Sequence, residues 1–122
     1  TLSGARGCRI VNNTVVDCDP EYPGPPWILV DKHKNGTASS DCIIRNNLTT
    51  SVSQQPGVSL DHNLVVTDPE RFFANIHARD LRLRADSPAV DAGSSDLAPQ
   101  RDIVGTIRPR GSAVDVGAFE SR

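Results

Sequence analysis

A short motif that occurs three times constrains the fold of this chain more than any other feature. Each copy consists of a short apolar run, a turn-forming asparagine and a second apolar run. The copies cover residues 9–16, 43–50 and 59–66 (RIVNNTVV, IIRNNLTT and SLDHNLVV). Because one such unit cannot bury its apolar face alone, we expect the three units to stack against one another.

The three copies align on Asn13, Asn47 and Asn63. The spacing of two before each asparagine is typical of a strand, and asparagine tolerates the left-handed backbone of a tight bend. Stacked about 4.7–4.9 Å apart, the asparagines would form a structural ladder of hydrogen bonds. Small or apolar residues recur five and three positions before each asparagine and two positions after it: Cys8, Cys42 and Val58; Ile10, Ile44 and Leu60; Val15, Thr49 and Val65.

The spacing of the copies is irregular, with 34 residues between the first two asparagines and 16 between the last two. Solenoids accommodate such irregularity as loops on one side of the coil. Residues 19–26 and 31–40 are rich in turn formers and fill the longer interval, while residues 27–30 (WILV) predict a further strand. An ordinary β-sandwich is the alternative, and the recurring columns favour the solenoid.

The composition argues against several classes of protein. A net charge of −2 gives no general attraction to nucleic acids or anionic membranes. One Trp, one Tyr and three scattered Phe are too few for a base-stacking platform. The apolar runs are too short to span a membrane. We therefore expect no nucleic-acid partner and no membrane span.

The three cysteines do not suggest a cofactor. Cys8 and Cys42 share an inward column, where they either pack as small apolar residues, which we favour, or form a disulfide. Cys18 precedes a proline-rich loop and is expected to be exposed. The spacing typical of zinc sites is missing, so we expect no metal. Calcium stays an alternative because four loop acids supply oxygen ligands without defined spacing: Asp17, Asp19, Glu21 and Asp31.

The last third of the chain follows a different pattern. Leu81 and Leu83 alternate with arginines, which indicates an edge strand with one solvated face. Val114 and Val116 alternate with polar or small residues in the same way. Around these stretches, residues 87–93 (SPAVDAG), 102–109 (DIVGTIRP) and 114–120 (VDVGAFE) form three recognisable phrases.

These phrases resemble the C-terminal segment of bacterial right-handed parallel β-helix proteins, which typically end in SPAIDAG, DIDGNPRP and DIGAYE. The likeness is strongest over residues 80–120, and the asparagine motifs resemble the family's coils. It implies an all-β fold, a short right-handed parallel β-helix of about three coils over residues 1–67. Residues 68–122 would form a C-terminal coil and cap in the same domain.

The resemblance also implies a setting. Many such proteins are secreted or lie at the bacterial cell surface, and several relatives are polysaccharide lyases. The matching phrases belong to a structural cap, so no reaction is carried over. We expect a carbohydrate-associated module, the C-terminal part of a polysaccharide-active protein. If these 122 residues are the complete protein, the N-terminal end of so short a solenoid has no cap, and we then expect a homo-oligomer that forms through this end.

Direct stacking of the second and third copies predicts a polar patch on the outer face. It would put Arg45 on Asp61 and Asn46 on His62. The simpler interpretation is a solvated ion pair worth about 0.2–1 kcal/mol. The more specific interpretation is a sugar-acid site, in which Arg45 pairs with a uronate carboxylate and either His62 or a nearby lysine acts as the base.

A basic loop supplies the remaining candidates. Lys32, His33 and Lys34 precede an Asn-Gly turn. A polysaccharide lyase needs a cation to neutralise the uronate and a base to take a proton, and these residue types suit both roles. A charged surface turn is the simpler explanation. The residues expected to contact carbohydrate are Trp27, Lys34, Arg45 and Asn46.

Whether the chain is an enzyme stays open at this point. A lyase would use the basic loop and the polar patch. An esterase-type hydrolase would need a triad assembled between coils or at the oligomer interface. Ser59, Asp61 and His62 lie too close along one strand to form a triad alone, and no Gly-x-Ser-x-Gly elbow is present. A purely structural assembly unit is the third alternative.

Overall fold

A computed structural model describes residues 1–18, 21 and 28–121 of the chain. In this part, α1 (Pro69–Phe72) is the single helix and all other regular elements are strands. The strands before α1 form three levels of three, which we number in chain order. The first level is β1 (Leu2–Ser3), β2 (Arg9–Val11) and β3 (Thr14–Val15); the second is β4 (Ile28–Asp31), β5 (Cys42–Arg45) and β6 (Leu48–Thr49); the third is β7 (Val52–Ser53), β8 (Val58–Asp61) and β9 (Leu64–Val65).

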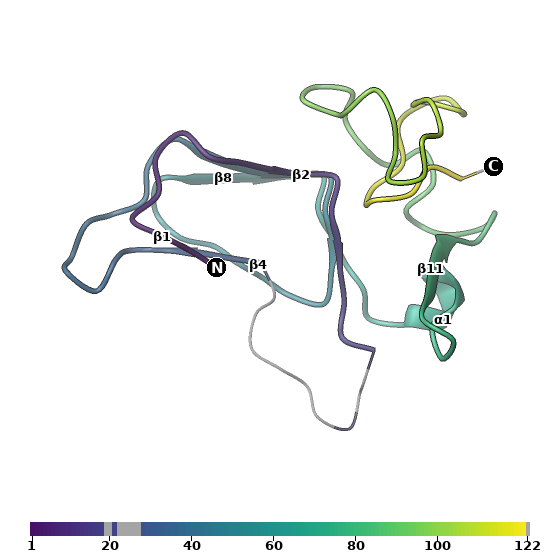
Figure 1. Cartoon of the computed structure of the whole chain (residues 1–122), viewed down its shortest axis with the longest axis horizontal. Coiled ribbons are helices and arrows are strands. Elements are labelled where there is room, and N and C mark those ends of the chain that lie inside the picture. The colour runs from purple at the N-terminus through teal and green to yellow at the C-terminus, as the bar shows by residue number, and fades with distance from the viewer. Residues whose placement is uncertain (19–20, 22–27, 122) are drawn as a thin grey trace.

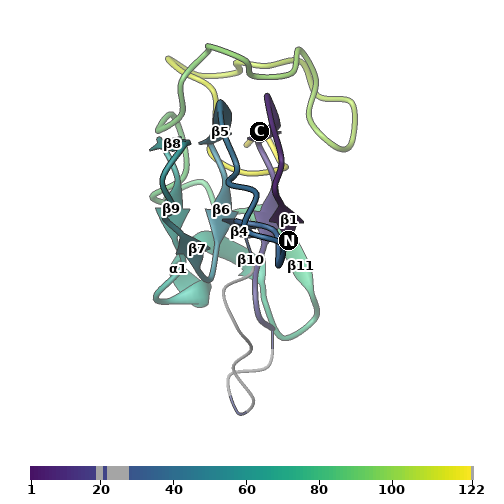
Figure 2. The ribbon, with the colours of Figure 1, turned by 90° about the vertical axis from the view of Figure 1, so that its left-hand side faces the viewer.

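Each level contributes one strand to each of three parallel sheets. The sheets have the orders β1-β4-β7, β2-β5-β8 and β3-β6-β9. Ile10 pairs with Ile44, and Ile44 pairs with Leu60, so the three motifs stack in the register that the alignment predicts. Figure 1 looks along this stack and Figure 2 across it. The expectation of an all-β, solenoid-like stack of parallel strands is confirmed.

Residues with a left-handed backbone conformation flank the β2-β5-β8 sheet at both ends of its strands. The residue before each ladder asparagine has a positive φ, in the column Asn12 (51°), Asn46 (56°) and His62 (51°). We call these three positions the bend column. The sequence interpretation assigned the bend to the aligned asparagines, and the structure corrects it by one residue. On the opposite side, Asp41 (52°) and Gly57 (78°) turn the chain into β5 and β8.

The aligned asparagines form the expected ladder. The Nδ2 of Asn13 donates to Oδ1 of Asn47 at 2.9 Å, and the Nδ2 of Asn47 donates to Oδ1 of Asn63 at 2.9 Å. The backbone N–H groups of Asn13 and Asn47 donate to the same oxygens at 3.0 Å. Asn47 is fully buried. Its amide therefore supplies hydrogen bonds that the bent backbone cannot make with a neighbouring strand.

The apolar interior of the stack is completely buried only at the second level. Val30 and Ile44 have no exposed surface, and Cys42 has 2%. The corresponding first-level residues Leu2 and Ile10 are only half-buried, and Val65 of the third level is 47% exposed. Cys8, Cys18 and Cys42 are free thiols, with Cys18 exposed and Cys42 in the core as expected.

The C-terminal segment lies against the side of the stack. β10 (Phe73–Asn75) and β11 (Asp80–Leu83) form an antiparallel pair, which confirms the predicted edge strand. A second apolar cluster joins this pair to the outer face of the β3-β6-β9 sheet, with Leu48, Phe73 and Val116 at its centre. In Figure 1 the segment stands beside the corner where β2 leads into β3.

Residues 84–121 have an irregular backbone, although the alternation of Val114 and Val116 indicated a strand. That expectation was wrong because Asp115 between them is also buried, with 1% exposure. Asp115 instead accepts the backbone N–H of Asp91 at 2.8 Å. A buried ion pair, Arg108 with Glu120 at 3.0 Å, holds the end of the segment in place. No helix among the described residues is long and apolar enough to cross a membrane.

The ladder is expected to contribute most of its stability at the second level. Asn47→Ala leaves several buried backbone groups without partners, so we expect a loss of about 2–4 kcal/mol in the free energy of unfolding. Asn13→Ala is the matched control in the same column, where the side chain is exposed, and should cost about 0.5–1.5 kcal/mol. Urea unfolding in dilute solution measures both. Equal losses at the two positions would contradict the account.

Gly57 is expected to be required where Gly36 is not. A Cβ at Gly57 would lie 2.3 Å from the Ser39 carbonyl oxygen at a φ of +78°, whereas a Cβ at Gly36 (φ +90°) meets nothing within 4 Å. Gly36→Ala should cost about 1–2 kcal/mol through backbone strain. Gly57→Ala should cost clearly more, because the backbone of residue 39 must also move. Thermal unfolding of the two variants tests this order, and a smaller loss for Gly57→Ala would refute it.

Candidate functional site

The polar patch predicted from the columns exists and is centred on Arg45. Arg45 ends β5 and Asp61 ends β8, and the two residues are paired in register. The Arg45 Nε donates to Asp61 Oδ1 at 2.6 Å, and Nη2 donates to Oδ2 at 2.9 Å. This is the planar two-bond geometry in which a guanidinium holds a carboxylate most firmly. The stacking of Arg45 on Asp61 is thereby confirmed.

Two further residues complete the patch, and we call Arg45, Asp61, His62 and Asp96 the corner cluster. The Nη1 of Arg45 donates to the carboxylate of Asp96, which comes from the C-terminal segment. The Nδ1 of His62 lies 2.8 Å from Asp61 Oδ1. Asp61 therefore orients the imidazole, which is 48% exposed. Asp96, with 70% of its side chain exposed, forms the outer edge of the cluster.

The electrostatics of the cluster are set by the arginine. Its hydrogen bonds hold the pKa of Asp61 below the usual range, with a smaller contribution from His62. The bond to Asp61 in turn raises the pKa of Arg45 above its ordinary value. Asp61 and Asp96 both bind the guanidinium, and the Arg45 side chain as a whole is only 15% exposed. A uronate carboxylate would have to displace one of these partners, so the expected role of Arg45 as a uronate clamp is disfavoured.

Asn46 is not on the surface, contrary to the expectation that it joins His62 in the patch. The side chain is fully buried. Its Nδ2 donates to the Ser94 carbonyl at 2.7 Å, and its Oδ1 accepts the Ser94 N–H at 2.8 Å. Asn12 is also buried and donates to the Asp115 carbonyl at 3.2 Å. The asparagines of the bend column thus bind the C-terminal segment, which leaves them no contact with carbohydrate.

The basic loop lies away from the corner cluster. It joins the end of β4 to the start of β5, whereas Arg45 is at the far end of β5. The loop is a closed turn in which the His33 N–H donates to the Thr37 carbonyl at 2.8 Å. The His33 Nδ1 accepts the Asn35 N–H at 3.2 Å. The structure therefore does not bring Lys32, His33 and Lys34 together with His62, and Trp27 lies outside the described residues.

A hydrolytic triad and a metal site find no support in the geometry. In the described part of the chain, no serine hydroxyl makes a hydrogen bond with His62, and Ser59 is separated from it along β8. Within the same residues no group of three His, Cys, Asp or Glu side chains converges on a common point. Asp19, one of the acids weighed for calcium, lies outside the described residues.

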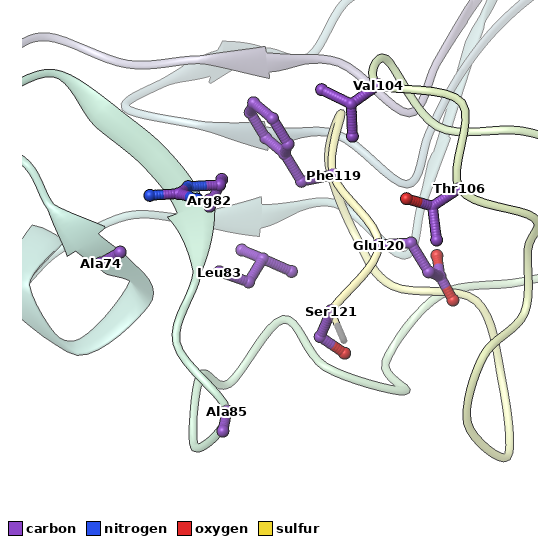
Figure 3. Close-up of a pocket in the computed structure, with 9 residues that line it drawn as sticks. All are labelled: Ala74, Arg82, Leu83, Ala85, Val104, Thr106, Phe119, Glu120 and Ser121. Carbon is purple, nitrogen blue, oxygen red and sulfur yellow. The ribbon is translucent and has the colours of Figure 1, made fainter.

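A pocket that the sequence did not reveal lies in the C-terminal segment. Figure 3 shows it between β11 and the last residues of the chain. It has a volume of about 280 Å³ and is lined by Arg82, Leu83, Val104, Thr106, Phe119 and Ser121, among others. Asp80 holds the Arg82 guanidinium, and this bond lowers the pKa of Asp80 to about 2. The alternation of leucine with arginine predicted β11, which forms one wall of this pocket, but it did not predict the pocket itself.

Comparisons with known proteins add no further constraint. No protein-family model matches the chain, and searches of curated proteins and of solved structures found no match.

The pair of Arg45 with Asp61 is expected to make stability acid-sensitive. The folded-state pKa of Asp61 lies below its unfolded value. Its contribution is therefore complete above about pH 4 and is lost as the pH falls through the folded-state pKa. The difference in unfolding free energy between wild type and Asp61→Asn should be largest near neutral pH and should shrink as the pH falls below the unfolded-state pKa of about 4. Urea unfolding at several pH values measures it, and a difference that does not change with pH would show the assignment to be wrong.

Proposed function

We propose that this chain is a carbohydrate-associated module, a short right-handed parallel β-helix of about three coils with a C-terminal cap. It would belong to a secreted or cell-surface bacterial protein that acts on polysaccharide, and it would self-associate through the first-level end. The three parallel sheets and the asparagine ladder support the fold. The resemblance of residues 80–120 supports the setting.

One observation supports the binding role most directly. His62, held by Asp61, and the exposed Asp96 form a polar edge on the outer side of the stack. Carboxylates and an imidazole accept and donate the hydrogen bonds that sugar hydroxyls make. With one arginine and two carboxylates, the cluster has an excess of negative charge while His62 is neutral. This charge favours a neutral, hydroxyl-rich polysaccharide over a uronate polymer.

The enzymatic alternatives are supported less well. A lyase would need a free cation beside a base, and Arg45 is occupied by two carboxylates. A hydrolase would need a nucleophile beside His62, and the described residues supply no bonded hydroxyl there. The structural alternative rests on the half-exposed interior at the ends of the stack.

Affinity electrophoresis tests the binding proposal. The wild-type chain should be retarded in gels containing galactomannan, a neutral polysaccharide, and much less in gels containing alginate, a uronate polymer. His62→Ala combined with Asp96→Ala should abolish the retardation, since both exposed polar groups of the cluster are then missing.

Lys34→Ala is the matched control, because this residue lies on the basic loop away from the cluster. It should leave the galactomannan retardation unchanged. Retardation by alginate that depends on Lys34 would instead assign binding to the basic loop. Absence of retardation in both gels would refute the proposed binding.

A further inference from the structure

The two ends of the stack expose the same columns of residues. At the first-level end, Leu2, Ile10 and Val15 line an open hollow of about 480 Å³. At the third-level end, Leu60 is half-buried and Val65 is 47% exposed. Ile10 and Leu60 belong to one column, and Val15 and Val65 belong to another. In the described part of the chain, the outer edges of both levels have no strand partner.

The ladder ends with complementary hydrogen-bonding groups. Each asparagine oxygen accepts from the level before it, so the Oδ1 of Asn13, at the first level, receives no bond from the described residues. At the other end, the Asn63 Nδ2 donates to the Ile44 carbonyl at 2.7 Å. Its second hydrogen and its backbone N–H have no acceptor among the described residues. One end of the ladder thus lacks a donor and the other lacks an acceptor.

The C-terminal segment is shifted along the stack towards the first level, so it does not cover the three levels equally. It covers Asn46 through Ser94 and Asn12 through Asp115, and it leaves His62, the third member of the bend column, exposed. At the opposite end it extends past the first level. Figure 2 shows a yellow-green loop of this segment beyond β1. The segment therefore overhangs the first-level end and leaves His62 uncovered at the third-level end.

The overhanging loop, residues 101–107, is closed by a bridge between Arg101 and Ile107 and presents an apolar surface. Ile103 is 70% exposed and lines a cavity with Asn13 and Arg101 beside the end of the ladder. The loop is ordered by Asp102, whose Oδ1 accepts the N–H groups of Val104 at 3.0 Å and Thr106 at 2.7 Å. Val104 and Ile107 of the same loop are also exposed, by 63% and 60%, and a group of exposed aliphatic side chains on an ordered loop is typical of a contact surface.

We propose that copies of this chain stack head to tail, with the first-level end of one copy on the third-level end of the next. The inference rests on the self-association in the proposed function and names the partner surface. The Asn63 donors of one copy would meet Asn13 Oδ1 of the next, so that the ladder and the three parallel sheets continue. The overhanging loop would cover His62, which the other copy leaves exposed.

The charges and the symmetry agree with this arrangement. Continuing the register would put Asp61 of one copy opposite Val11 of the next and on the side of its Arg9, which contacts Asp41 of its own copy at 3.8 Å, so the junction brings no like charges together. A contact between two different ends does not close on itself, so it produces an open series of oligomers instead of a dimer.

A complementation experiment tests the arrangement. Leu2→Lys puts a charge into the first-level end alone, and Val65→Lys puts one into the third-level end alone. By sedimentation velocity, the wild-type mass should rise with concentration beyond that of a dimer. Each variant alone should stay at 13.1 kDa. An equimolar mixture should form a one-to-one complex, because each variant retains the end that its partner lacks. Circular dichroism and urea midpoints establish that both variants are folded.

The alternatives give different results. Dimers of Val65→Lys alone would mean that first-level ends pair with each other, which overturns head-to-tail stacking while self-association stands. A mixture that remains monomeric, with both variants folded, also overturns it. A wild-type chain that is monomeric at every concentration overturns self-association itself, while the gel experiment on polysaccharide is unaffected.

A milder variant keeps the test independent of the lysines. Asn13→Ala removes the ladder acceptor at the first-level end and should weaken wild-type self-association about tenfold. Lys34→Ala, on the exposed basic loop between the second-level strands β4 and β5, is the control and should leave the association constant unchanged. An unchanged association constant for Asn13→Ala would exclude continuation of the ladder.

Discussion

The asparagine ladder is the interaction on which the rest of this structure depends. A left-handed residue at each bend turns the backbone out of one sheet and into the next, so the following N–H cannot pair with the neighbouring strand. The ladder oxygens of Asn47 and Asn63 accept these N–H groups. Because the same amides also donate to each other and to the Ile10 and Ile44 carbonyls, the corner is satisfied without water. Two sheets can therefore meet at a buried corner.

The same corner determines where the C-terminal segment attaches. Asn12 and Asn46 of the bend column use their amides to bind its backbone, and the Gly117 N–H donates to the Asn46 carbonyl at 2.8 Å. The segment itself has little regular structure. Buried carboxylates take the place of strand pairing. The Asp102 carboxylate, for example, accepts hydrogen bonds from the backbone N–H groups of Glu120, Thr106 and Val104. Burial opposes ionisation of Asp102, but these donors outweigh it and keep its pKa low.

The periodic part of the fold could be predicted from the sequence because stacking repeats the same contacts at every level. The columns identified the interior, the ladder and the contact of Arg45 with Asp61. The burial of Asn46 could not be predicted in this way, since it depends on Ser94, which is 48 residues away and outside the repeat. The strand predicted around Asp115 was wrong for a related reason. Alternation assigns a polar residue to the surface, whereas a buried carboxylate can accept hydrogen bonds from backbone N–H groups.

The distribution of buried residues links assembly to the candidate site. Only the second level buries its interior fully, and burying a half-exposed Leu or Val side chain is worth about 1.5–3 kcal/mol at most. Further levels on either side would therefore add stability that three levels alone lack, as in other stacked-repeat proteins. The corner cluster lies at the third-level edge, where Asp61 and His62 would face the overhanging loop of the next copy. Head-to-tail stacking would thus cover His62, the residue that the proposed polysaccharide binding needs exposed. Because polysaccharide and the next copy would occupy the same surface, binding and assembly would oppose each other, and bound polysaccharide would favour the unstacked chain.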